Sequence, residues 1–135
     1  MKSIKYKVVF EPFAERHFIR TFAKKYKNAW EFILSAITQE FEKIDILFLK
    51  SIAEYIPDKK ADVMIAKTEF KISGIQESRH GSGNRCIVAI NKKLNTVCVL
   101  VVYHKNDLGE GNETANWKRI VKENYPEYSK LLTNL

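Results

Sequence analysis

The chain has 135 residues, 45% of them hydrophobic, which predicts a single globular domain over residues 1–135 and leaves little room for a second one. Its 23 Lys and Arg residues against 16 Asp and Glu residues give a formal charge of +7, which fits a polyanionic partner and a simple solubility role equally well. The longest apolar run, Val97 to Tyr103, is too short to span a bilayer, and the N-terminus lacks a signal-peptide pattern, so we expect a cytoplasmic protein that does not contact membranes.

The first half of the chain predicts a strand followed by two helices. Polar and apolar residues alternate at the N-terminus up to Tyr6, Ile4 to Phe10 predicts a first strand, and Glu11-Pro12 ends it. Aromatic residues then recur every four positions from Phe18 to Tyr26 among basic residues, which indicates an amphipathic helix with a basic outer face. Asn28 can cap a second, longer helix. The apolar stripe of that helix consists of Trp30, Ile33, Leu34, Ile37, Phe41, Ile44 and Phe48.

The second half predicts three strands and one more helix. Pro57-Asp58 indicates a turn, and from Met64 onward the hydrophobic period changes to two, as in a half-buried strand. The expected strands cover residues 64–72, 85–90 and 97–103, and the last two are joined by a short hairpin loop. Asn112 or Thr114 can cap the last helix, which we expect to end near Pro126. The element order is therefore β-α-α-β-β-β-α.

Three segments of this second half resemble the RelE/ParE superfamily of toxin–antitoxin toxins, and the RelE-like subgroup in particular. They are Gly83 to Val88, Val97 to Lys105 and Asn112 to Lys118. The resemblance implies an α+β fold, a small antiparallel sheet packed against an N-terminal helical hairpin with a C-terminal helix. It also implies a metal-free endoribonuclease toxin that cleaves mRNA on the ribosome, inhibits translation, and is neutralised by a cognate antitoxin protein. The chain departs from many nuclease members at Trp117, where they place a catalytic Tyr or His.

Metal-free RNA cleavage uses the 2′-hydroxyl as nucleophile and needs a proton acceptor, cations for the charged phosphorane and a donor for the leaving oxygen. The chain carries such residues near the ends of its expected strands. The catalytic candidates are Arg85, Lys105, His104 and Tyr103, and the RNA-binding candidates are Lys67, Lys71, Arg79 and His80. We expect Lys67, Lys71, Arg85, Tyr103 and Lys105 to lie near one another on one face of the sheet.

Each candidate also has a structural interpretation. Lys67 and Lys71 can form a solvated strand face, and Arg85 can pair with a carboxylate for purely structural reasons. If the last strand is regular, His104 points away from Tyr103 and can be a packed core residue. A bulge or the end of the strand would free it.

The sequence offers no metal or cofactor motif. The three histidines are scattered, and Cys86 and Cys98 lack ligand spacing, so we expect no cofactor and two free thiols. Two alternatives to the nuclease remain open. One is a ParE-like toxin that inhibits DNA gyrase without being an enzyme, and the other is a non-toxic relative that only binds a partner.

Overall fold

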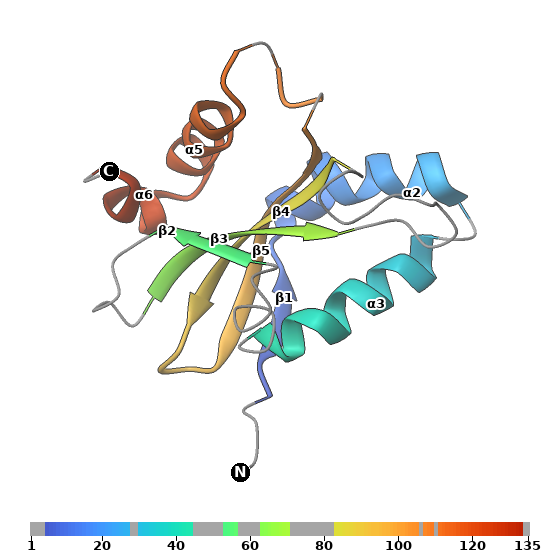
Figure 1. Cartoon of the computed structure of the whole chain (residues 1–135), viewed down its shortest axis with the longest axis horizontal. Coiled ribbons are helices and arrows are strands. Elements are labelled where there is room, and N and C mark those ends of the chain that lie inside the picture. Colours follow the sequence, from blue (N-terminus) through green and yellow to red (C-terminus); the bar gives the residue numbers. More distant parts are fainter. Residues whose placement is uncertain are drawn as a thin grey trace.

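The computed structural model describes residues 5–27, 30–44, 53–56, 63–70, 83–105, 107–109 and 111–133. In these ranges the protein is an α+β fold in which helices cover both faces of one five-stranded sheet (Figure 1). None of the helices in the described ranges is long and apolar enough to cross a membrane.

The sheet has the strand order β1-β5-β4-β3-β2. Its strands are β1 (Lys7–Phe10), β2 (Ala53–Ile56), β3 (Val63–Phe70), β4 (Asn84–Asn91) and β5 (Thr96–His104). Neighbouring strands from β2 to β5 are antiparallel, but β1 runs parallel to β5, so the expectation of a purely antiparallel sheet is wrong at this edge. A parallel pair needs a long crossover connection, which the helices and strands between β1 and β5 supply.

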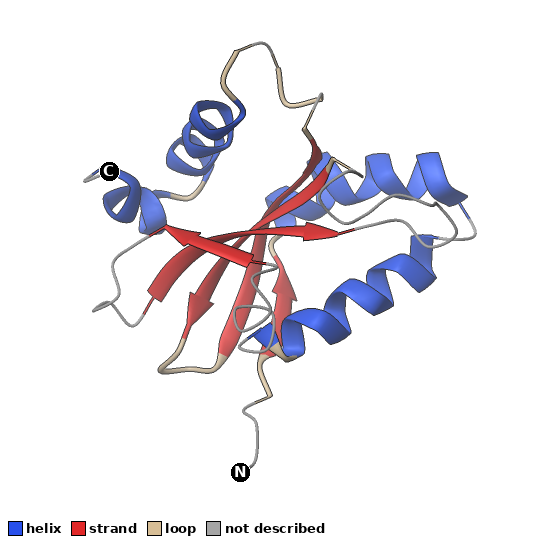
Figure 2. Ribbon diagram, viewed as in Figure 1, coloured by secondary structure: helices blue, strands red, loops and turns tan. Residues whose placement is uncertain are grey.

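The first helical stretch runs without a break through α1 (Pro12–Ala14), a π-helical turn η1 (Glu15–Ile19) and α2 (Arg20–Tyr26). Pro12 stands in its first turn, where its missing N–H costs no hydrogen bond. Helix α3 (Trp30–Glu42) follows, and both helices lie on the same side of the sheet (Figure 2). The expected capping residue Asn28 lies outside the described residues.

The stripe predicted for the second helix is largely confirmed. Its buried members are Trp30, Ile33, Ile37, Phe41 and Ile44, and Leu34 is partly buried against the same core. Phe48 lies outside the described residues. Helix α3 thus stays on the sheet because its apolar side chains recur at the helical period on one face.

The opposite face of the sheet is covered by α5 (Glu113–Asn124) and α6 (Pro126–Thr133). Asn112 caps α5, because its side-chain oxygen accepts a hydrogen bond from the Ala115 N–H at 3.0 Å. The predicted helix does end before Pro126, but Pro126 then begins α6, which the sequence reading did not predict. Proline ends a preceding helix and is also favoured in the first turn of a new one. The position of Pro126 alone therefore did not show whether another helix follows.

A β-bulge in β5 decides which face the last residues of that strand occupy. Ile87 pairs with Val101 and Val88 pairs with Val99, which leaves Leu100 as the extra residue. Val99 therefore faces α3, whereas Leu100 and Val101 both join the core under α5 and α6. Strict alternation from Val99 would have placed Tyr103 under the N-terminal helices, but the bulge moves it to the other face.

Candidate active site

One row of side chains crosses three strands at the end of the sheet where β3 and β5 finish and β4 begins. Arg85 in β4 lies directly opposite Glu69 in β3 on one side and opposite Tyr103 in β5 on the other. Directly opposed residues project from the same face, so the three side chains form one row. Lys67 precedes Glu69 by two residues on that face, and Glu113 approaches the row from the first turn of α5. We call Lys67, Glu69, Arg85, Tyr103 and Glu113 the strand-end cluster.

One oxygen of the Glu113 carboxylate interacts with two other members of the cluster. The Tyr103 hydroxyl donates a hydrogen bond to Glu113 Oε2 at 2.7 Å, and the Lys67 Nζ lies 4.0 Å from the same atom. This oxygen carries negative charge, accepts from a phenol and faces an ammonium group. An anionic oxygen of a phosphate would find the same two partners at this position.

Arg85 and Glu69 form the second charged pair of the cluster. The Arg85 Nε lies 3.7 Å from Glu69 Oε1, and one terminal nitrogen, Nη1, donates to the Asn84 carbonyl oxygen at 3.3 Å. Arg85 is only 3% exposed. A buried guanidinium needs a carboxylate nearby to offset its desolvation, which Glu69 provides.

The Tyr103 hydroxyl is held in its protonated form. Burial raises the pKa of Tyr103 well above its usual value near 10, and the Glu113 carboxylate raises it further. The positive charge of Arg85 opposes this rise without cancelling it. At neutral pH Tyr103 therefore keeps its proton and is available as a hydrogen-bond donor.

His104 and Lys105 follow Tyr103 at the end of β5. His104 is half-buried, and its ring lies against Gly83, where a built Cβ atom would approach the His104 Nε2 to 2.6 Å. Lys105 is exposed, and its backbone N–H donates to the Gly83 carbonyl oxygen at 2.8 Å. Lys105 thus lies at the same end of the sheet as Arg85, as the sequence reading expected.

The structure brings together only part of the predicted set. Lys67, Arg85 and Tyr103 share one face. The register stays regular from Tyr103 to His104, so His104 projects from the opposite face, as expected for a regular strand end. Lys105 follows the last residue of the strand. The other candidates, Lys71, Arg79 and His80, lie outside the described residues.

Two carboxylates of the cluster were not predicted as site residues. Glu69 was visible in the alternation of its strand, between two lysines on the outward face. From the sequence, Glu113 could orient Lys105 or His104 or only cap the last helix; because α5 folds back over the sheet, it contacts Tyr103 and Lys67 instead.

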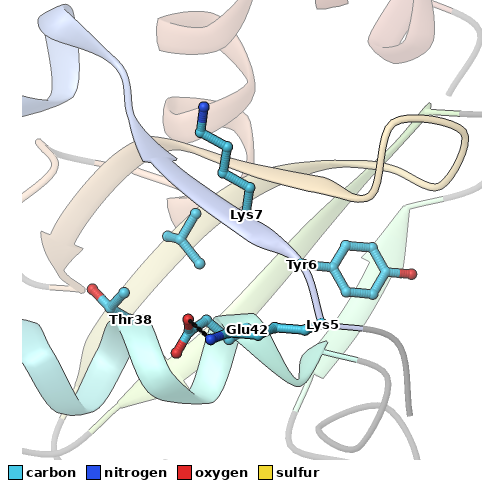
Figure 3. A pocket seen from close by; sticks show the side chains of 6 residues that line it. Lys5, Tyr6, Lys7, Thr38 and Glu42 are labelled. Carbon is cyan, nitrogen blue, oxygen red and sulfur yellow. Dashed lines mark ion pairs between the residues drawn. The ribbon is translucent and has the colours of Figure 1, made fainter. Parts of the chain in front are cut away.

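A surface pocket elsewhere on the molecule contains none of the predicted residues. It lies between β1 and α3, where Lys5 reaches across to Glu42 at 3.3 Å while Lys7 points away (Figure 3). The Tyr6 N–H donates to the Glu42 carbonyl oxygen at 2.9 Å and ties β1 to the end of this helix. The pocket is therefore a hollow where β1 packs against α3, and its polar contacts serve to hold these two elements together.

Within the described residues, the cysteines and other candidate metal ligands form no further site. Cys86 and Cys98 are both free, which confirms that expectation, and burial raises the pKa of each thiol. Among the described residues, no group of three or more His, Cys, Asp and Glu side chains is arranged to hold a metal ion.

Comparison of the chain with protein-family models found no match, and searches of curated proteins and of solved structures found none either.

Proposed function

We propose that this protein is a metal-free endoribonuclease toxin of the RelE type, which cleaves mRNA on the ribosome and is neutralised by an antitoxin protein. The observation that carries the proposal is the strand-end cluster. A phenol donor, a lysine and an arginine converge there from three neighbouring strands, and Lys105 and His104 lie at the same end of the sheet. Cleavage through the 2′-hydroxyl requires cations and proton-transfer groups of these kinds.

The binding step in this proposal replaces a carboxylate by a phosphate. Glu113 Oε2 occupies a position between the Tyr103 hydroxyl and the Lys67 ammonium group. When RNA binds, the Glu113 carboxylate moves aside and the bridging 5′-oxygen of the scissile phosphate takes its position beside the Tyr103 hydroxyl, while Lys67 and the exposed Lys105 supply charge to the dianionic phosphorane. Fixed cations stabilise that state more than the monoanionic diester, which lowers the barrier. Arg85 is buried and acts through the field it exerts on Tyr103.

The proton-transfer roles follow from the protonation of Tyr103. His104, which projects from the other face at the end of β5, accepts the proton of the 2′-hydroxyl as that oxygen attacks phosphorus, so the scissile nucleotide must lie around the strand end. The bond from phosphorus to the 5′-oxygen breaks, and the Tyr103 hydroxyl donates a proton to the leaving oxygen. The products are a 2′,3′-cyclic phosphate and a free 5′-hydroxyl. The free ring nitrogen of a neutral imidazole is a suitable acceptor for this proton.

Controlled expression in a bacterial host tests the proposal, with primer extension to map mRNA ends and purified protein to measure RNA cleavage in EDTA. Lys105→Ala, His104→Gln and Tyr103→Phe should each lower the cleavage rate about a hundredfold to a thousandfold. Lys92→Ala is the matched control for Lys105→Ala, because Lys92 is an exposed lysine in the hairpin at the other end of the sheet. Circular dichroism checks that each variant is folded. A folded Lys105→Ala/His104→Gln variant with parental toxicity would overturn the assignment.

A second candidate is a non-enzymatic toxin of the ParE kind that inhibits DNA gyrase, which needs no accessible acid–base residues. Arg85 and Tyr103 are only 3% and 2% exposed, and both face carboxylates, as expected if the cluster simply holds α5 on the sheet. In that case purified protein should inhibit DNA supercoiling by gyrase and leave RNA intact. A relative that only binds a partner should do neither.

A further inference from the structure

We propose a second RNA-binding surface, separate from the strand-end cluster, on the outer face of the first helical stretch. We call Arg16, Arg20 and Lys24 the basic row. The proposal rests on the proposed function only for the identity of the polyanion, and its chemical basis is a line of exposed cations that fits a phosphate backbone.

The basic row faces solvent because the opposite side of the helix is bound to the core. Ile19 and Phe22 are buried in the core under the N-terminal helices, whereas all three members of the row are exposed. Burial of the apolar side fixes the rotation of the helix on the sheet, so the cations cannot turn inward.

The π-helical turn keeps the row straight. Hydrogen bonds in a π turn span five residues, so this turn is wider than an α-helical one. The four-residue step from Arg16 to Arg20 crosses η1 and falls short of a full turn. The equal step from Arg20 to Lys24 lies in α2 and slightly exceeds a full turn. The two deviations oppose each other, and the three side chains stay in line along the helix.

No carboxylate in this part of the sequence offsets the charge of the row. The sequence contains no Asp or Glu between Glu15 and Glu31, and it adds Lys25 and Lys27 to the three row members. Elsewhere the structure pairs cations with acids, as in the strand-end cluster and at the end of α3. On the exposed face of α5, Glu123 lies among the basic residues. From Arg16 onward, the exposed side of this helix therefore carries basic residues and none that are acidic.

The chemistry of this face favours RNA over an acidic protein. The exposed side chains from Arg16 to Lys25 are all polar or charged. A protein interface needs aromatic or aliphatic side chains at its centre to provide affinity. A phosphate backbone needs only cations and exposed donors, without reading the bases.

The helix also lies in a suitable place for a long strand. Its first part, α1 and η1, packs against β5, and α2 continues from there away from α5 and α6 (Figure 1). This helix and the strand-end cluster lie on opposite faces of the sheet, so an RNA that contacts both must pass around the end of the sheet.

The test measures equilibrium binding of a fluorescein-labelled 2′-O-methyl RNA strand at several salt concentrations. This probe keeps every phosphate but has no free 2′-hydroxyl, so the full chain binds it without cleaving it. Arg16→Gln/Arg20→Gln should lower the slope of log affinity against log salt by about 1.4, because each lost contact to a single strand changes it by about 0.7. Glutamine is a good helix former, and circular dichroism confirms that the helix remains.

Lys92→Gln/Lys93→Gln is the matched control, because it removes the same charge from the exposed hairpin between β4 and β5. Relative to the parent, the slope of log affinity against log salt should change less than half as much in this control as in Arg16→Gln/Arg20→Gln. Equal slopes for the two variants, or a parental slope for the row variant, would overturn the proposal. So would displacement of the probe by polyglutamate as effective as that by unlabelled RNA, which would indicate an acidic protein partner. Failure of RNA cleavage alone would refute the nuclease but not this surface.

Discussion

Tyr103 shows how one buried hydroxyl links the candidate chemistry to stability. It donates to Glu113 across the joint between β5 and α5, so the same contact holds the helix and keeps the phenol protonated. Catalysis needs that proton to be mobile, whereas folding needs the hydrogen bond to persist. The buried phenol therefore lowers the free energy of unfolding at alkaline pH, and this effect can be measured without knowing the substrate.

We expect the protein to lose stability above about pH 10, and Tyr103→Phe to reduce that loss. The folded pKa of Tyr103 is raised, so above about pH 10 the unfolded chain releases a proton that the folded chain keeps. The free energy of unfolding then falls with pH, by up to about 1.4 kcal/mol per pH unit for one such group. Urea unfolding at neutral and alkaline pH measures the two slopes. Equal slopes for parent and variant would contradict the raised pKa, whatever stability the lost hydrogen bond costs at neutral pH.

Comparing alanine substitutions at Gly83 and Gly111 separates the stability cost of backbone strain from that of a steric clash. Gly83 and Gly111 both have positive φ, at +77° and +92°, so alanine is strained at either position. Only at Gly83 would the new Cβ meet a neighbour, the ring of His104. Gly111→Ala should therefore cost about 1 kcal/mol from strain alone, and Gly83→Ala should cost more and also displace His104. Urea unfolding measures both losses, and NMR titration of His104 follows its ring. Equal costs with an unchanged His104 signal would rule out the contact.

Among the secondary-structure elements, the bulge in β5 and the joint between α5 and α6 depend on each other. The Tyr125 hydroxyl, at that joint, donates to the carbonyl oxygen of the bulged residue Leu100 at 2.7 Å. Tyr125→Phe keeps the ring but removes the partner of this buried carbonyl, which should cost about 1–3 kcal/mol. Tyr128→Phe is the control, since it removes a hydroxyl of the same helical layer that is only half-buried. Urea unfolding that shows equal losses for the two variants would mean that the bulge does not need Tyr125.

The sequence predicted the elements whose side chains repeat with a clear period. Helix α3 followed from its apolar stripe, and β3 from its alternation, which places Met64 and Ala66 in one core and Ile65 in the other. In β5 every residue from Val97 to Tyr103 is apolar, so alternation carried no information and the bulge at Leu100 could not be seen. The short strand β2 was missed as well, because four residues beside a predicted turn offer too little pattern.

The candidate site could be predicted only where it depends on strand ends. Arg85 and Tyr103 begin and nearly end two adjacent antiparallel strands, so their proximity followed from the hairpin that joins them. The closure of this site by Glu113 depends on how α5 packs, and the local sequence does not fix that arrangement. The cations and the phenol of the site could thus be predicted from the sequence, but the contact of Glu113 with Lys67 and Tyr103 could not.

Across the whole molecule, two cores share one sheet, and the central strand β4 belongs to both. Val88 and Ile90 face the N-terminal helices, whereas Ile87 and Ala89 face α5 and α6. A rupture of either core uncovers one face of a strand that is buried along most of its length. We therefore expect the two helical layers to unfold together rather than as separate units.

The two tryptophans of the chain report on the two cores separately. Trp30 is buried under the N-terminal helices and Trp117 under α5, at 3% and 1% exposure. In Trp30→Phe the fluorescence comes only from Trp117, and in Trp117→Phe only from Trp30. Each variant loses stability by its own amount, so its fluorescence is compared with its own circular dichroism in the same urea titration. The two curves should coincide in both variants because the shared sheet couples the layers. If the Trp117 signal changes at lower urea than the circular dichroism, α5 and α6 detach first and leave a folded sheet with its N-terminal helices. That outcome would contradict the coupling, and it would mean that the face carrying Arg85 and Tyr103 opens without unfolding of the domain.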